Sequence, residues 1–327
     1  MMQTSVTVLI PAFNVADCIG SAIDSALAQS LAPAEIIVVD DASTDDTANI
    51  VASIAKIHTS VKLIRKTVNE GVAAARNTGI ELATADWIAI LDSDDRYLPD
   101  RLKYLVNAAE EQQLDFAADN FYNYDFFADK IVGIAIPPSM IGTSLKLDRY
   151  DYVRNCMTSM AGAVDFGLLK PIVRRSFLQA TGVRYRGDVR HGEDFIFYLN
   201  ALVLRAKFAI FPEGHYIYTQ RLGSLSGKHS TLTRTKVNFS AVETESRKLA
   251  DSELTRNDPK LMELLVLRSD KMKAARKYFE FRDAVSEGRL INAASRVFLD
   301  GEVRSCIIAA VRYKLKKRWS GLRRSSL

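Results

Sequence analysis

The chain has 327 residues, 48% of them hydrophobic and 25% charged, and a formal net charge of +5 at pH 7. These proportions exclude a disordered or fibrous chain and leave room for one large α/β domain or two smaller ones. The three cysteines lie far apart and form no CxxC pair, which argues against a disulfide framework or a zinc site and indicates a cytoplasmic protein.

The first 120 residues are predicted to alternate short strands with helices. We expect strands at 6–10, 35–39, 61–65, 87–91 and 114–118, and helices at 16–29, 45–57, 72–83 and 101–112. Ser43 or Thr44 is placed to cap the second of these helices. Strands and helices that alternate in this way indicate βαβ units, and hence an α/β fold with a mostly parallel sheet flanked by helices.

The rest of the chain is less regular. Residues 121–232 contain one clear helical pattern, at 193–203, and an apolar run at 208–211 that ends at Pro212. From 233 onward the apolar spacing is helical, with one break at 257–259. No run of 18 or more apolar residues occurs, so the sequence predicts no transmembrane helix.

Acidic residues follow two of the predicted strands. Asp40 and Asp41 end the second strand, and Asp92 and Asp94 come directly after the fourth. Ligands of open α/β sheets bind outside the carboxyl ends of the strands, and carboxylates there suit Mg²⁺ or Mn²⁺ and hydroxyl-rich ligands. Taken singly, the first pair is better explained by a turn and the second by a helix N-terminus. Their shared position favours a metal and nucleotide site.

Four segments together are similar to family 2 glycosyltransferases of the GT-A fold. They are VTVLIPAFN at 6–14, IIVVDDASTD at 36–45, the segment from NEG to ARNTG at 69–79, and LDSDD at 91–95. Their order and spacing make the resemblance specific over the first 100 residues. One departure is Ala42, where the family usually has glycine, and it indicates a less permissive turn.

This resemblance implies a set of residues for the donor. A UDP-sugar would be bound by residues of the loops at the strand ends, namely Pro11, Ala12, Asn14, Asp40, Asp41, Arg76, Asp92 and Arg221. Asp94, together with Asp92, would hold Mn²⁺ or Mg²⁺, and Asp41 would accept a hydrogen bond from the base. From the residues alone, Arg76 could equally pair with a neighbouring acid to hold the loops.

The resemblance also divides the chain. Residues 1–120 would form the nucleotide-sugar-binding half and 121–232 the acceptor-binding half of one catalytic domain, and 233–327 would be a C-terminal helical extension. Glu193 and Asp194, at the start of a predicted helix, look like the family's Glu-Asp motif. Asp194 would then be the general base that removes a proton from the acceptor hydroxyl in an inverting transfer. The alternative is an acidic helix start favoured by the helix dipole.

The expected acceptor follows from the same resemblance. Residues 218–226 resemble the closing segment of members that add one sugar, and the Gln-x-x-Arg-Trp pattern of processive synthases is absent. We therefore expect a single addition to a glycan or lipid-linked oligosaccharide, in bacterial exopolysaccharide or surface-polysaccharide biosynthesis. No nucleic-acid partner is expected.

The positive charge is concentrated at the C-terminal end. Residues 301–327 hold eight Lys or Arg and one acid, Glu302, which gives +7 there and −2 over the other 300 residues. Apolar and basic residues over 303–324 could lie on an anionic membrane at the inner face of the plasma membrane. They could equally form a docked helix with a solvated basic end.

Two other functions fit parts of the pattern. A nucleotidyltransferase also places carboxylates and a metal at strand ends, but it would need a basic, glycine-rich first loop, and no basic residue occurs here before Lys56. A non-catalytic nucleotide-sugar-binding module would have no need of acids at 92, 94 and 194 together.

Overall fold

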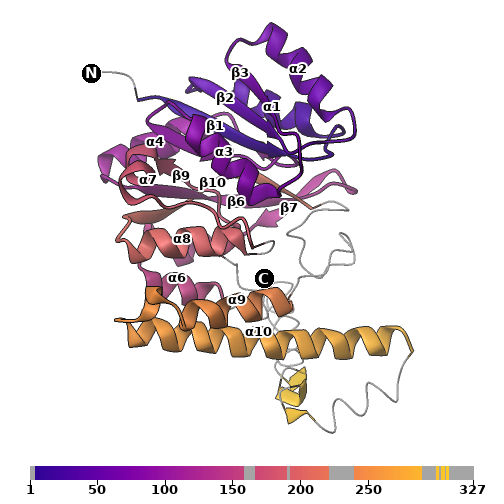
Figure 1. The fold of residues 1–327 in the computed structure, drawn as a ribbon, viewed down its shortest axis with the longest axis vertical. Helices are drawn as coiled ribbons and strands as arrows, with labels where there is room; N and C mark the ends of the chain where they lie inside the picture. The colour runs from indigo at the N-terminus through magenta and orange to yellow at the C-terminus, as the bar shows by residue number, and fades with distance from the viewer. Residues whose placement is uncertain are drawn as a thin grey trace, which may run out of the picture. The chain divides into compact units, whose positions relative to one another are not determined.

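The structure is a computed structural model in which the chain forms two compact units. The first comprises residues 1–152 and 166–237, and the second comprises 153–165 and 238–327 (Figure 1). The structure describes residues 4–157, 166–189, 192–220, 239–288, 300–301, 303–305 and 307–308.

The first unit is built on one sheet. Its strands are β1 (Val6–Ala12), β2 (Glu35–Asp40), β3 (Val61–Arg65), β4 (Trp87–Ile90), β5 (Arg96–Tyr97), β6 (Phe116–Asp125), β7 (Lys130–Ile134), β8 (Leu145–Leu147), β9 (Ile172–Arg174) and β10 (Phe208–Gln220). Their order is β3-β2-β1-β4-β9-β6-β10-β5, with β7 on β6 and β8 on β10. The ladders β3-β2, β2-β1, β1-β4 and β6-β10 are parallel, and the short strands β5, β7, β8 and β9 pair antiparallel. The mostly parallel sheet predicted from the sequence is confirmed.

Helices connect and cover these strands. They are α1 (Ile19–Leu27), α2 (Thr47–Ile57), α3 (Val72–Leu82), α4 (Arg101–Glu111), α5 (Pro138–Ile141), α6 (Arg149–Asn155), α7 (Arg175–Thr181) and α8 (Glu193–Val203), with a 3₁₀ turn, η2, at Phe166–Leu168. Every residue of β1, β2 and β4 is buried, as expected of parallel strands covered on both faces. On α3, Gly79 allows close packing, because a Cβ there would lie 1.9 Å from Leu9 Cδ1.

Two details of the structure go beyond or differ from the sequence pattern. The apolar run at 208–211 forms only the first part of a strand: β10 continues past Pro212 to Gln220, and its pairing with β6 is irregular between Phe211 and Gly214. A proline is tolerated in a strand at such an irregularity. Neither Ser43 nor Thr44 caps α2, whose N-cap is Asp46; both residues instead bond to the loop that follows β1.

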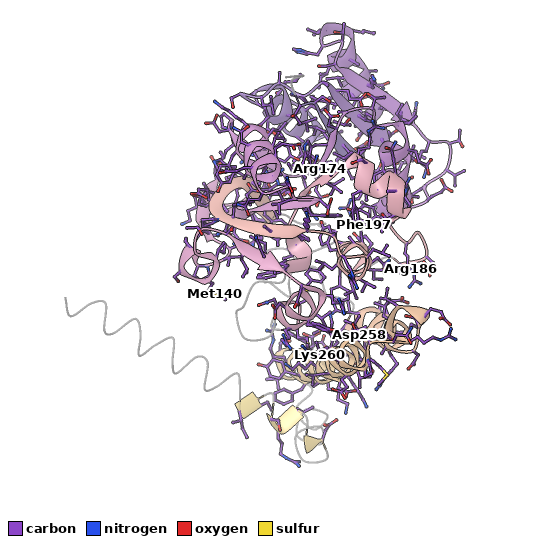
Figure 2. All side chains as sticks on the ribbon, turned by 90° about the vertical axis from the view of Figure 1, so that its left-hand side faces the viewer. Met140, Arg174, Arg186, Phe197, Asp258 and Lys260 are labelled. Carbon is purple, nitrogen blue, oxygen red and sulfur yellow. The ribbon has the colours of Figure 1, made fainter. Side chains whose placement is uncertain are left out.

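The second unit contains α9 (Phe239–Ala250), the 3₁₀ turn η3 (Glu253–Thr255) and α10 (Pro259–Ser286). Asp258 caps α10 by accepting a hydrogen bond from the Leu261 N–H, 3.1 Å away, and Figure 2 labels it at the start of that helix. Phe239 of α9 stacks on Phe279 of α10, with ring centroids 5.1 Å apart. Within the described parts of the chain, no helix has the length and apolar character that crossing a membrane requires.

Candidate active site

The predicted ligand side of the sheet is the edge where β1, β2 and β4 end. These strands are parallel, so Ala12, Asp40 and Ile90 reach the same edge. The loop after β1 is joined to the loop after β2 by Asn14, whose φ is 51°. Its Oδ1 accepts from the Thr44 N–H at 2.8 Å. The first two loops therefore form one fixed wall, while Pro11 and Ala12 lie buried in β1.

The turn after β2 contains the two acids predicted for the nucleotide. Asp40 is fully buried, and its Oδ1 accepts from the Ser43 N–H at 3.2 Å. Ala42, which lies between Asp41 and Ser43, has φ 63°, a left-handed conformation that glycine adopts without strain. The departure noted in the sequence thus falls at the residue where glycine would be favoured.

Asp41 joins the second loop to the third. Its Oδ2 accepts from the Gly71 N–H at 2.7 Å and its Oδ1 from the Glu70 N–H at 3.1 Å. Lys66 Nζ lies 3.0 Å from Oδ1. Each carboxylate oxygen has two lone pairs, so Asp41 still has capacity to accept from a ligand.

The centre of the site is a buried cluster of two cations and three acids. Arg76 of α3 is 2% exposed. Its NH2 lies 2.8 Å from Asp92 Oδ1, and its NH1 lies 2.9 Å from Asp194 Oδ1 and 3.2 Å from Glu193 Oε1. Lys170 Nζ lies 2.7 Å from Asp194 Oδ2 and 3.1 Å from Asp92 Oδ2. The strand-end acid Asp92 and the helix-start acid Asp194, 102 positions apart in the sequence, are thus held by the same two cations.

Each charge in this cluster depends on the others. Burial alone would lower the pKa of Arg76, but Asp194, Asp92 and Glu193 outweigh it and raise that pKa well above its usual value. Burial likewise opposes the charge of Lys170, and Asp194 and Asp92 raise the Lys170 pKa. Burial would raise the pKa of Asp92, but Lys170 and Arg76 hold it below its usual value. For Glu193, burial and then the charge of Asp194 raise the pKa.

Lys170 is the member of the site that sequence reasoning missed. Its backbone carbonyl accepts a short hydrogen bond from Arg101, which is buried and paired with Asp119 at 2.9 Å. The preceding carbonyl, of Leu169, accepts from the Tyr198 hydroxyl at 2.8 Å. The backbone at Lys170 is therefore held by two buried side chains, Arg101 and Tyr198, that are distant from it in the sequence.

A signal for Lys170 existed in the sequence. It is a single charge at the end of the apolar run 166–169, and it is followed by Pro171 and a second apolar segment. A lysine in such a context is buried, and buried lysines need acidic partners. The sequence could not say which acids these were.

The turn at Asp92–Asp95 separates its acids. Asp95 N–H donates to the Asp92 carbonyl at 3.0 Å. Asp95 is buried and accepts from the Tyr216 hydroxyl at 2.6 Å and from the Thr219 N–H at 2.7 Å. Burial, followed by the charges of Asp94 and Asp92, raises the Asp95 pKa well above its usual value. Asp95 thus anchors the turn to β10, and Asp94 is left partly exposed.

These acids fit a divalent cation only in part. Asp92 and Asp94 are both partly exposed, but both oxygens of Asp92 are paired with cations. Among the residues that the structure describes, no three His, Cys, Asp or Glu side chains gather into a set that could hold a metal. Mg²⁺ is commonly bound by one or two carboxylates together with substrate phosphates and water. Asp94 could be one of those carboxylates.

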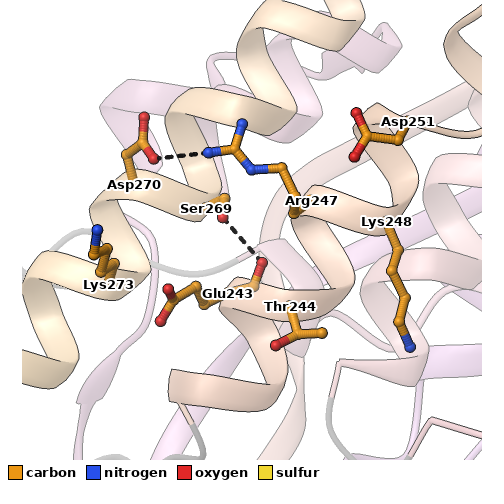
Figure 3. Close-up of a pocket in the computed structure, with 8 residues that line it drawn as sticks. All are labelled: Glu243, Thr244, Arg247, Lys248, Asp251, Ser269, Asp270 and Lys273. Atoms are coloured by element: carbon orange, nitrogen blue, oxygen red, sulfur yellow. Dashed lines mark hydrogen bonds and ion pairs between the residues drawn. The ribbon is translucent and has the colours of Figure 1, made fainter.

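Two predicted features lie outside the described residues. Arg221 is one, and most of the basic segment 303–324 is the other. A separate cavity of about 330 Å³ lies between α9 and α10 in the second unit (Figure 3). Its lining carries equal numbers of acids and bases, which favours no charged ligand: Glu243, Asp251 and Asp270, with Arg247, Lys248 and Lys273.

Comparisons with known proteins indicate the family and the fold of the chain. Residues 7–163 match the family described as Glycosyl transferase family 2. The chain is 36% identical over 232 residues to the succinoglycan biosynthesis protein ExoO of Rhizobium meliloti, a match that covers 68% of this chain and 62% of ExoO. It is 30% identical over 202 residues to an uncharacterized glycosyltransferase of Haemophilus influenzae, covering 62% of this chain and 73% of that protein. The chain thus spans less than two thirds of ExoO.

Two further matches name a ligand. The chain is 34% identical over 143 residues to the UDP-Glc:alpha-D-GlcNAc-diphosphoundecaprenol beta-1,3-glucosyltransferase WfaP of Escherichia coli, covering 43% of this chain and 55% of WfaP. Its fold is similar to that of S. aureus TarS in complex with UDP-GlcNAc, with a TM-score of 0.60 and 21% identity over 80% of this chain and 72% of that one.

Proposed function

Because this chain belongs to glycosyl transferase family 2, we propose that it transfers one sugar from a UDP-sugar to a hydroxyl of a glycan or lipid-linked acceptor. The observation that carries the proposal is the cluster in which Arg76 and Lys170 hold Asp92 beside Asp194, next to the partly exposed Asp94. The similarity to ExoO supports a role in bacterial exopolysaccharide biosynthesis. The action named for WfaP supports a lipid-linked acceptor, and a place at the inner face of the plasma membrane is proposed from the sequence alone.

The donor would lie along the carboxyl ends of β1, β2 and β4. The base would lie against the carboxyl end of β1 and the loop that follows it, at Pro11, Ala12 and Asn14, and Asp41 would accept a hydrogen bond from the base. TarS, whose fold is similar, was solved with UDP-GlcNAc, and this supports a UDP-sugar as donor. Arg221 is proposed to reach the diphosphate, on sequence grounds alone.

Asp94, with Asp92, is proposed to hold Mn²⁺ or Mg²⁺. When bound, such an ion offsets the negative charge on a departing diphosphate. Arg76 and Lys170 reach Asp92 from inside the protein, so they fix this carboxylate while Asp94 stays accessible from outside. Asp94, with Asp92 behind it, would therefore hold the ion at this turn, where its charge would offset that of the diphosphate.

Asp194 is proposed as the general base of an inverting transfer. Its carboxylate would take the proton of the acceptor hydroxyl as the acceptor oxygen bonds to the anomeric carbon and the bond from that carbon to the UDP oxygen breaks. Arg76 and Lys170 each donate to one Asp194 oxygen, at 2.9 and 2.7 Å. Both oxygens keep a second lone pair for the proton, and the two cations hold the carboxylate in one orientation.

The test is a panel of UDP-, GDP- and TDP-sugars incubated with Mn²⁺, with the released nucleotide measured. We expect release of UDP from a UDP-sugar; release of pyrophosphate would instead indicate a nucleotidyltransferase, and binding without turnover a non-catalytic module. Asp94→Ala should abolish turnover. Asp194→Asn should lower transfer by roughly 10²- to 10⁴-fold while the UDP-sugar still binds.

A matched control is Glu81→Gln, since Glu81 is an exposed acid on α3, the helix that carries Arg76. It should keep full activity. Wild-type turnover by Asp94→Ala with metal present would contradict the metal assignment. The anomeric configuration of the product, read by NMR, tests inversion directly.

A further inference from the structure

The hairpin that joins β6 to β7 ends in exposed apolar side chains. Four of them lie within seven residues and are each about half exposed: Phe126 (48%), Phe127 (54%), Ile131 (51%) and Val132 (53%). We call these four residues the apolar tip. Burying such side chains would be favourable, because it removes apolar area from water. The apolar tip is therefore a candidate contact surface.

The hairpin holds these side chains outward. Asp125 Oδ1 accepts from the N–H groups of Phe127 and Ala128, both at 3.0 Å. The Phe126 N–H donates to the Gln220 carbonyl of β10 at 3.3 Å. The pairing of β7 with β6 is irregular between Asn123 and Tyr124, opposite Val132, and a bulge of this kind re-aims side chains. The turn therefore satisfies several of its own polar groups.

The tip lies on the ligand side of the sheet. β9 pairs Val173 with Ile88 of β4 and also with Phe116 of β6, so these two residues are level. Both strands run in the same direction, because each is antiparallel to β9. The end of β4 at Ile90 is then level with Ala118, and β6 continues for seven more residues to Asp125. At ~3.3 Å per residue, β6 extends roughly 23 Å beyond the end of β4, and Figure 1 shows β7 beside this part of the sheet.

We infer that the apolar tip inserts into the interfacial region of a phospholipid membrane, and so presents the site to an acceptor held in that membrane. The inference rests on the proposed function for the acceptor. Three N–H groups of the turn, those of Phe126, Phe127 and Ala128, are bonded within the protein, which lowers the cost of leaving water. The two exposed charges of the turn, Asp129 and Lys130, are of opposite sign, so insertion rests on the apolar side chains.

The size of the tip favours lipid over a protein partner. An aromatic side chain contributes ~150–250 Å² when fully buried, so the two half-exposed phenylalanines together offer roughly 150–250 Å², and the smaller half-exposed Ile131 and Val132 add less than that. A stable protein interface needs about 800 Å² from each partner. The apolar tip offers less area than that, whereas insertion among lipid chains requires no complementary surface.

The experiment measures binding of the full-length protein to vesicles without donor or acceptor, so its outcome is independent of the transfer reaction. Vesicles of phosphatidylcholine alone report apolar insertion, because they carry no net charge to attract the basic C-terminal segment. Vesicles with added phosphatidylglycerol report the contribution of charge. We expect the wild type to bind both kinds of vesicle. The affinity of Phe126→Ser/Phe127→Ser for phosphatidylcholine vesicles should be lower by about tenfold or more.

The matched control is Ile57→Ser. Ile57 is 78% exposed and ends α2; α2 connects the parallel strands β2 and β3, so its last residue lies at the opposite edge of the sheet. This variant should bind like the wild type. If the double variant fails to fold, Phe127→Trp should fold and show a blue shift of its emission on phosphatidylcholine vesicles larger than that of the wild type, whose tryptophans are Trp87 and Trp319.

Three results would overturn the inference: no binding of the wild type to phosphatidylcholine, equal binding of the double variant, or an emission shift of Phe127→Trp no larger than that of the wild type. Donor hydrolysis measured beside these assays separates the two claims. An active enzyme without vesicle binding overturns the tip alone, and an inactive protein that binds vesicles contradicts the proposed function alone.

Discussion

Lys170→Met removes one of the two cations of the buried cluster while nearly keeping the volume of the side chain. The ammonium lies 2.7 Å from Asp194 Oδ2 and 3.1 Å from Asp92 Oδ2, and the lysine is 6% exposed. In the variant, Arg76 alone would face Asp92, Asp194 and Glu193. At least one carboxylate would then be buried without a compensating charge.

The expected cost follows from that uncompensated charge. Removing one partner of a buried ion pair destabilises proteins by about 3–5 kcal/mol, so the free energy of unfolding at pH 7 should fall by that amount. The control is Lys62→Met. Lys62 pairs with Glu35 at 2.6 Å, but its side chain is 52% exposed, and Glu35 also accepts from Thr7 and Thr84. This variant should lose less than about 1 kcal/mol.

The pH dependence has a definite sign. The folded-state pKa of Asp92 is lowered, so its ion pairs stabilise the protein above the unfolded pKa of about 3.9 and are lost as the pH falls further. The pKa of Lys170 is raised, so its contribution is fully present below about pH 10.4 and is lost as the pH rises through the folded value. The gap between Lys170→Met and wild type should be greatest near neutrality and should narrow at about pH 4, where a carboxylate can take up a proton.

Urea unfolding of the three proteins at pH 7 and at acid pH measures this gap. Lys170→Arg, which keeps the charge, should recover part of the loss. A cost for Lys170→Met no larger than that for Lys62→Met, or a gap that stays constant on acidification, would refute the argument.

Two further predictions concern backbone positions that support the site. Gly79→Ala should lower the free energy of unfolding by about 1–3 kcal/mol, because its Cβ would meet Leu9 Cδ1 at 1.9 Å; Gly20→Ala on α1, with nothing within 4 Å, should instead be stabilising by about 0.5–1 kcal/mol. Urea midpoints measure both, and equal effects of the two substitutions would contradict the packing argument. Ala42→Gly should raise stability by up to about 1 kcal/mol, because Ala42 has φ 63°; a loss measured in the same assay would mean that the turn does not strain alanine.

Part of the fold could be predicted because it depends on local spacing. The alternation of apolar runs and helical patterns over residues 1–120 predicted β1 to β4 and α1 to α4, with ends that differ by a few residues. The predicted helix at 193–203 matches α8. The apolar run at 208–211 marks only the first part of β10, since an irregularity in the pairing admits Pro212 inside a strand that extends to Gln220. The boundaries predicted for the two halves of the catalytic domain remain predictions.

The sequence by itself determined which residue types stand at the strand ends, and its motifs were enough to indicate the family. It could not determine how those residues pair, because pairing joins positions far apart in the chain. Only the tertiary structure brings Lys170 between Asp92 and Asp194, through Arg101 and Tyr198, which fix the carbonyls of Lys170 and Leu169. Likewise, the structure decides that Asp95 is buried while Asp94 is partly exposed, since Asp95 is bonded to Tyr216 and Thr219 of β10. A buried charge needs a partner, and that partner can lie far away in the sequence, so the local spacing of residues does not predict it.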